Sequence, residues 1–223
     1  MVRRGAAGGS GFARCGRRRY SKTRKPMKII GLTGGIGMGK STASASFRRH
    51  GVPIFDADQA VHALQAPGGR AVRPIEAAFP GTTQGGAVDR EALRRAVLGN
   101  PAALKILERI VHPLVRDAEK RFLAAARRAG KSFVVLDIPL LLETGGEKRV
   151  DLVVVVSAPS AVQAVRVMRR PGMTAERLAA IRARQMPDAE KRRKADVVVH
   201  SGLSRHFAVA ELKRLLLRLR GAR

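Results

Sequence analysis

The sequence contains a single cysteine, Cys15, which excludes an intrachain disulfide and a cysteine-rich metal site. It has no tryptophan, one tyrosine and seven phenylalanines, so few rings are available for stacking single-stranded nucleic acid. No apolar run approaches the roughly 18–20 residues that a membrane-spanning helix requires, and even residues 133–142 are interrupted by Asp137. These absences predict a soluble protein of a reducing cytoplasm, without a membrane partner.

Acidic residues are also scarce. The chain has 17 against 44 lysines and arginines, a net charge of +27. Residues 1–26 hold nine of the basic residues and no acid, so residues 27–223 keep 35 basic and 17 acidic side chains, a net +18. The positive electrostatic field of such a protein favours the binding either of nucleic acid or of small anionic substrates such as nucleotides. Charge alone does not distinguish the two.

Residues 1–26 are rich in glycine, serine and arginine and show no apolar periodicity. We expect them to form a disordered basic N-terminal extension. Three explanations remain open: an upstream start codon before a protein that begins at Met27, a basic tail, or an arginine-rich organelle transit segment. A secretory signal is not expected, because no apolar segment of roughly 7–15 residues follows the charges.

From Met27 onward, short apolar runs alternate with helical patterns, which is typical of a parallel sheet covered by helices on both faces. The length of the chain indicates one globular unit over residues 27–223. A long helical segment separates the second and third strands and is too long for a simple crossover, so we expect a helical insertion there, with helices at 89–98 and 102–129. The predicted class is α/β, with five strands at residues 28–32, 52–55, 133–136, 152–156 and 197–199.

Residues 34–41 read Gly-Gly-Ile-Gly-Met-Gly-Lys-Ser and satisfy the pattern G-x-x-x-x-G-K-[ST] between an apolar strand and a helix. Glycines let such a loop curl so that its amides face phosphate oxygens, and the following helix adds its positive end. Lys40 would reach the β- and γ-phosphates and Ser41 would ligate Mg²⁺. A glycine-rich turn without chemical function is the alternative, and the flanking strand and helix argue against it.

Carboxylates follow two of the predicted strands. Asp56 and Asp58 lie where ligands of open α/β sheets bind, and one of them could act as a base; capping of the next helix is the alternative. Asp137 could hold Mg²⁺ through water or simply stabilise a turn. His112 precedes Pro113 and, taken alone, is best interpreted as a structural histidine of the core or of a helix break.

Basic residues are dense over residues 166–194, and a solvated helical face is the usual meaning of such a run. Arg170 follows Arg166 at the i+4 position, which on one helix would point both side chains the same way. That arrangement would suit a clamp on a phosphate chain, so we expect these two arginines to belong to a lid.

These segments together resemble the dephospho-CoA kinase family, a group of P-loop kinases. Residues 31–41 nearly match its opening, with Met38 where serine is more usual. The similarity continues in unbroken order to about residue 217 through Asp56-Ala57-Asp58, His112-Pro113-Leu114, Pro139-Leu140-Leu141-Leu142-Glu143, Gln163, Arg166, Arg170, Gln185 and Ala195-Asp196. Two departures are Pro171 where aspartate is usual and His200 where asparagine is often found.

The resemblance implies a three-layer P-loop kinase fold with an acceptor-binding helical insertion at about 60–130 and a small arginine-rich lid at about 166–194. It implies ATP-dependent phosphorylation of the ribose 3′-hydroxyl of dephospho-CoA, the last step of coenzyme A biosynthesis, with Mg²⁺. Catalytic roles then fall to Asp58, Lys40 and Arg170. ATP contacts are expected from Gly35, Ile36, Gly37, Met38, Gly39, Lys40, Ser41, Thr42 and Arg166. Acceptor contacts are expected from Asp56, Asp58, His112, Pro139 and Leu140, and metal contacts from Ser41 and, through water, Asp137.

Two rival functions remain. Another small-molecule kinase of the same group, acting on a nucleoside monophosphate or shikimate, would share the phosphate loop, although the order of the other motifs argues against it. A nucleic-acid-binding ATPase would use the basic surface. We expect no nucleic-acid partner, a monomer or small homo-oligomer, and a cytoplasmic location.

Overall fold

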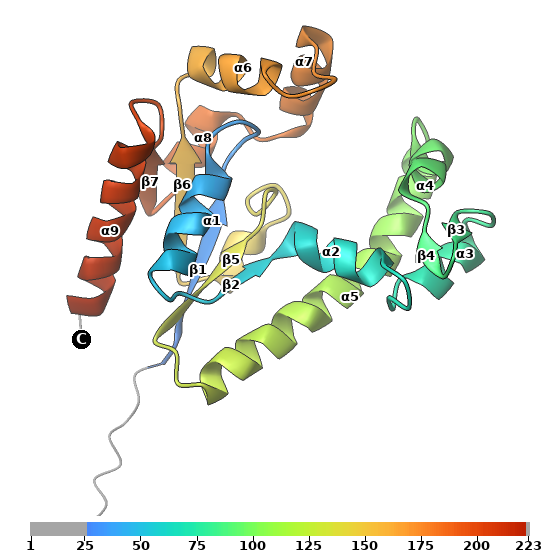
Figure 1. Ribbon diagram of the computed structural model, residues 1–223, viewed down its shortest axis with the longest axis horizontal. Helices are drawn as coiled ribbons and strands as arrows, with labels where there is room; N and C mark the ends of the chain where they lie inside the picture. The colour runs from blue at the N-terminus through green and yellow to red at the C-terminus, as the bar shows by residue number, and fades with distance from the viewer. Residues whose placement is uncertain (1–25, 222–223) are drawn as a thin grey trace, which may run out of the picture.

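The computed structural model describes residues 26–221, so the expected N-terminal extension lies outside the described residues except for Pro26. Strands and helices alternate along most of this length (Figure 1). In chain order the elements are β1 (Lys28–Thr33), α1 (Lys40–Arg49), β2 (Ile54–Asp56), α2 (Ala57–Gln65), α3 (Val72–Ala78), β3 (Thr83–Gln84), β4 (Ala87–Val88), α4 (Arg90–Val97), α5 (Pro101–Arg128), β5 (Phe133–Asp137), η1 (Gly146–Arg149), β6 (Leu152–Ser157), α6 (Ser160–Met168), α7 (Ala175–Arg184), α8 (Asp188–Arg193), β7 (Val197–His200) and α9 (Arg205–Gly221).

The main sheet has the strand order β2-β5-β1-β6-β7, and all four pairings are parallel. The five predicted strands are therefore confirmed, although β2 begins at Ile54, two residues later than predicted. Parallel pairing brings the carboxyl ends of all five strands to one edge. The pairings Leu32 with Asp137 and Asp56 with Asp137 place residues from β1, β2 and β5 side by side at that edge.

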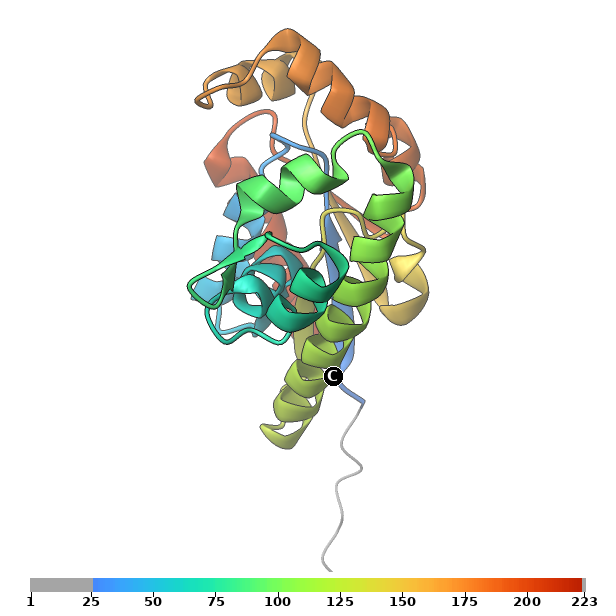
Figure 2. The same cartoon turned by 90° about the vertical axis from the view of Figure 1, so that its right-hand side faces the viewer.

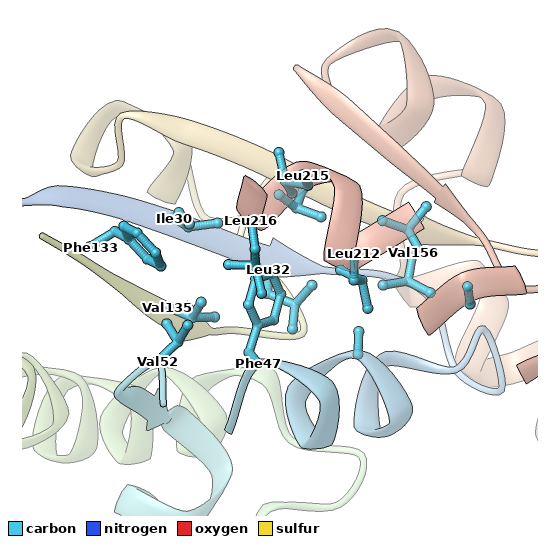
Figure 3. Packing of buried hydrophobic residues seen from close by; sticks show 14 residues of the cluster. Ile30, Leu32, Phe47, Val52, Phe133, Val135, Val156, Leu212, Leu215 and Leu216 are labelled. Carbon is cyan, nitrogen blue, oxygen red and sulfur yellow. The ribbon is translucent and has the colours of Figure 1, made fainter. Parts of the chain in front are cut away.

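Alternate residues of the strands face two different layers, because successive side chains of a strand point to opposite faces. On one face, Ile30 and Leu32 of β1 pack with Phe47 of α1 and Leu212 of α9 (Figure 3). On the other face, Val134 of β5 belongs to a cluster with side chains of α5. The helices on both faces confirm the predicted α/β architecture and hold the carboxyl edge of the sheet in place.

Elements α2 to α5 extend to one side of the sheet and contain a hydrophobic cluster of their own (Figure 1). Asp89 caps α4 and accepts hydrogen bonds from the amides of Glu91 and Ala92, so the predicted helix at 89–98 begins with its cap at Asp89. The prediction of helix alone was incomplete here, since β3 and β4 form a short antiparallel pair. Gly85 and Gly86 make its turn with φ of 58° and 76°, the positive pair that a type I′ hairpin turn requires. The division into core, insertion and lid stays a prediction.

Helices α6 and α7 lie beyond the carboxyl ends of the strands, above the loop that joins β1 to α1 (Figures 1 and 2). Within residues 26–221, no helix combines the length and the apolar character needed to cross a membrane.

Candidate active site

The loop between β1 and α1 has the shape that its sequence predicts. Gly37 and Gly39 adopt φ of 73° and 93°, which side chains with a Cβ rarely tolerate. A Cβ on Gly34 would lie 2.6 Å from the carbonyl oxygen of Val156, so the loop also needs glycine for close packing on β6. Lys40 begins α1 directly after the loop, and the positive end of that helix faces the same space.

A cavity of about 620 Å³ opens above this loop. It brings together residues from five separate parts of the chain, including most of those predicted to bind ATP. The predicted residues that line it are Gly35, Ile36, Gly37, Gly39, Lys40, Ser41, Thr42, Asp58, Pro139, Arg166 and Arg170. The space is therefore bounded by loop amides, the Lys40 ammonium, the Asp58 carboxylate and three guanidinium groups, because Arg205 lines it as well as the two predicted arginines.

Asp137 lies under this cavity at the end of β5 and is 2% exposed. One of its carboxylate oxygens accepts a hydrogen bond from Lys40 Nζ at 2.5 Å, and the other accepts from Ser44 Oγ at 2.5 Å. The ion pair holds the lysine beside the loop. Each oxygen of Asp137 thus accepts one hydrogen bond within the protein, and its contact with a metal through water stays a prediction.

The two carboxylates after β2 have different surroundings. Asp56 caps α2 through the amide of Gln59 at 3.0 Å and lies 3.7 Å from an Arg48 nitrogen, so the capping interpretation is correct for this residue. Asp58 lies inside α2 and lines the cavity. Partial withdrawal from water raises its pKa; Lys40 opposes this effect, while the nearby negative charges of Asp56 and Asp137 add to it. A raised pKa suits a group that must accept a proton.

Both predicted lid arginines line the cavity, but they do not share a helix. Helix α6 ends at Met168, so the prediction of an i,i+4 pair on one helix is wrong. Pro171 disfavours helical conformation at Arg170, and Gly172 turns the chain with φ of 70°. Arg166 donates to Ser201 through two nitrogens, to Oγ at 3.0 Å and to the carbonyl oxygen at 2.5 Å.

Comparison with known proteins identifies the family to which this chain belongs. The family model described as dephospho-CoA kinase matches residues 28–204. The dephospho-CoA kinase of Paramagnetospirillum magneticum is 61% identical over 197 residues, which cover 88% of this chain and 93% of that protein. The chain belongs to the dephospho-CoA kinase family. The dephospho-CoA kinase of Mesorhizobium japonicum is 55% identical, over 88% of this chain and 99% of that protein.

Solved structures agree on the fold. The crystal structure of TT1252 from Thermus thermophilus is similar, with a TM-score of 0.77 and 36% identity over 87% of this chain and 98% of that one. Dephospho-CoA kinase from Campylobacter jejuni gives a TM-score of 0.62 at 23% identity, covering 86% and 97%. Shikimate kinase from Acinetobacter baumannii gives 0.52 at 15%, covering 91% and 98%. The last two comparisons show a shared fold alone.

Four residues predicted from the dephospho-CoA kinase motifs lie outside the cavity lining, besides Asp137. Met38 is 3% exposed and turns away, its sulfur accepting the Ala158 amide at 3.1 Å. His112 is exposed beside a separate hollow of about 450 Å³ on α5. Because α5 also continues through Pro113, the interpretations as a core histidine and as a helix-break residue are both wrong. Leu140 is 41% exposed, and Asp56 caps α2 as described. Acceptor contacts from His112, Leu140 and Asp56 stay predictions.

Other residues of this family member take part in the site without having been assigned a role from the sequence. Ser201 donates from Oγ to the Met38 carbonyl at 2.6 Å and so fastens the loop after β7 to the phosphate loop. Gln163 and Gln185 were recognised only as matches to the family pattern, yet both bond to the backbone of Ile36. Their partners lie more than 120 residues away in sequence, so no local pattern indicates these contacts.

Proposed function

We propose that this protein transfers the γ-phosphoryl group of ATP to the ribose 3′-hydroxyl of dephospho-CoA, which gives coenzyme A and ADP. Family membership supports the reaction. The observation that carries the proposal is the single cavity in which the phosphate loop and Lys40 face Asp58 and Arg170.

In this reaction the 3′-oxygen forms a bond to the γ-phosphorus while the bond from that phosphorus to the β,γ-bridging oxygen breaks. The hydroxyl proton passes to the carboxylate of Asp58, and ADP leaves with the bridging oxygen. Positioning and neutralisation of charge provide most of the catalysis of such transfers. The loop amides, Lys40 and Arg170 are the groups of this chain that would stabilise the negative charge on the transferred phosphoryl group.

Magnesium is proposed as the metal of the reaction. The oxygen donors nearby suit it, because Mg²⁺ prefers hydroxyl, carboxylate and water ligands. Ser41 at the start of α1 would bind the ion directly and Asp137 would contact it through water. The ion, when bound, would neutralise charge on the β- and γ-phosphates.

The acceptor is tested by measuring ADP release from ATP and Mg²⁺ with dephospho-CoA, AMP, CMP and shikimate offered separately. Turnover confined to dephospho-CoA is the expected result, and faster turnover with any other acceptor would overturn the assignment. Mass analysis of the product identifies the phosphorylated hydroxyl. The same preparation, analysed by light scattering, tests the predicted monomer or small homo-oligomer; the cytoplasmic location stays a prediction from the sequence.

A nucleic-acid-binding ATPase remains the alternative from another class, since the basic residues greatly outnumber the acidic ones. Filter binding with RNA and DNA over a range of salt concentrations separates the two. Binding that persists at moderate salt would support the alternative, because nonspecific attraction to phosphates weakens steeply as salt is added.

A further inference from the structure

Both backbone groups of Ile36, in the phosphate loop, are hydrogen-bonded by side chains from the α6–α7 segment. Gln185, directly after α7, accepts the Ile36 N–H through Oε1 at 3.1 Å. Gln163, in α6, donates from Nε2 to the Ile36 carbonyl at 2.8 Å. The backbone of Ile36 is therefore held by two side chains, one from near each end of the α6–α7 segment, which lies over the phosphate loop.

Arg182 defines the orientation of Gln163. Its Nε and Nη2 both donate to Gln163 Oε1, at 3.0 and 2.5 Å. A guanidinium group has no acceptor, so the oxygen of the Gln163 amide must face Arg182 and its nitrogen must face the Ile36 carbonyl. Gln163 is 5% exposed. Loss of its amide would therefore leave the Ile36 carbonyl without a hydrogen-bond donor and poorly hydrated.

The loop also packs directly on α6. A Cβ at Gly37 would lie 2.5 Å from Val167 Cγ2 and 3.2 Å from the Gln163 carbonyl oxygen. The segment that makes these contacts carries Arg166 and Arg170, which line the phosphate cavity. Its position and the conformation of the loop amides are thus linked through Ile36.

We infer that Gln163 and Gln185 are positioning residues: they hold the phosphate loop in the form that binds anions and connect it to the segment carrying the two arginines. A glycine-rich loop has many alternative conformations, so bonds that select one of them favour ligand binding. The inference rests on the proposed function, in that a nucleotide is the ligand whose phosphates the loop receives.

The test replaces each glutamine by methionine, which keeps the length of the side chain and its neutral charge but removes both hydrogen-bonding groups. We expect Gln163→Met and Gln185→Met each to weaken ADP binding roughly three- to tenfold, the effect of one lost hydrogen bond. Calorimetry with ADP, in the absence of any acceptor, measures this directly. Gln84→Met, at an exposed position of β3, is the matched control and should leave ADP affinity unchanged.

Three further readouts separate positioning from a general loss of structure. The KM for dephospho-CoA should stay unchanged in both variants while the KM for ATP rises. Exchange of the Ile36 amide hydrogen should accelerate in Gln185→Met, which removes its acceptor, and less in Gln163→Met. The double variant should lose less ADP affinity than the two single losses combined, because both bonds act on one residue.

An ADP affinity unchanged in both single variants would overturn the inference, as would strictly additive losses in the double variant. A lowered thermal stability with normal ADP affinity would show a merely structural role and would also overturn it. These outcomes are distinct from failure of the proposed function: an unaltered protein that does not bind ADP refutes the nucleotide site itself, and turnover with another acceptor leaves the ADP measurements valid.

Discussion

Lys40 Nζ lies 2.5 Å from Asp137 Oδ1, and this ion pair joins the phosphate loop to the end of a strand 97 residues away. The Asp137 side chain is 3% exposed, so its charge depends on Lys40 and Ser44 for compensation. The same lysine is thus part of the folded structure and of the proposed chemistry.

Lys40→Ala is therefore expected to reduce both activity and stability. Removing a group that stabilises the transition state lowers kcat by about 10²- to 10³-fold. Removing one partner of a buried ion pair lowers the free energy of unfolding by about 3–5 kcal/mol. This range is an upper value here, because 19% of the Lys40 side chain is exposed. The double variant Lys40→Ala/Asp137→Asn should regain part of the lost stability in urea unfolding and stay inactive. Normal kcat in either variant would refute the role of Lys40.

Asp58→Asn tests the proposed base. The variant keeps the shape of the side chain but cannot take up the proton, so kcat should fall by about 10²- to 10⁴-fold. ATP affinity should change little, because in the proposed mechanism the loop and Lys40 bind the phosphates and Asp58 acts on the acceptor hydroxyl. Stopped-assay kcat and calorimetric ATP binding are measured on the same preparation. Near-normal turnover would exclude Asp58 as the base.

The raised pKa of Asp58 also predicts a dependence of stability on pH. A carboxyl whose pKa is higher in the folded than in the unfolded state, near 3.8, favours folding below that value. This contribution is lost as pH rises through the folded pKa. Asp58→Asn should therefore raise the Tm at neutral pH by a small amount, and the gain should disappear at acidic pH. A gain that grows on acidification would contradict the direction of the shift.

Arg170→Ala should lower kcat/KM by weakening charge stabilisation on the transferred phosphoryl group. Arg169→Ala is the matched control, since Arg169 is the exposed neighbour with the same charge and is absent from the described cavity lining. We expect a reduction of about tenfold or more for Arg170 and less than twofold for Arg169. Equal effects of the two substitutions would mean that only the general positive field matters.

Lys191 forms a buried ion pair with Glu143 at 2.7 Å, and Glu143 also accepts the Met186 amide. Because the Lys191 side chain is 1% exposed, Lys191→Met should destabilise the fold by about 3–5 kcal/mol. Lys194→Met removes an exposed pair with Glu190 and should change stability by about 1 kcal/mol or less. Urea denaturation of both variants makes the comparison; similar losses would refute a special role for the buried pair.

The sequence by itself determined the strands, the phosphate loop and the family, because these depend on neighbouring residues: an apolar run marks a covered strand, and glycines before Gly-Lys-Ser mark the loop. It also indicated Asp58 and the two arginines. The tertiary structure alone decided that Lys40 meets Asp137, that Arg166 bonds to Ser201 and that two glutamines hold Ile36. Such contacts join residues far apart in the chain, and their geometry depends on how the sheet orders its strands and where α6 and α7 lie over it.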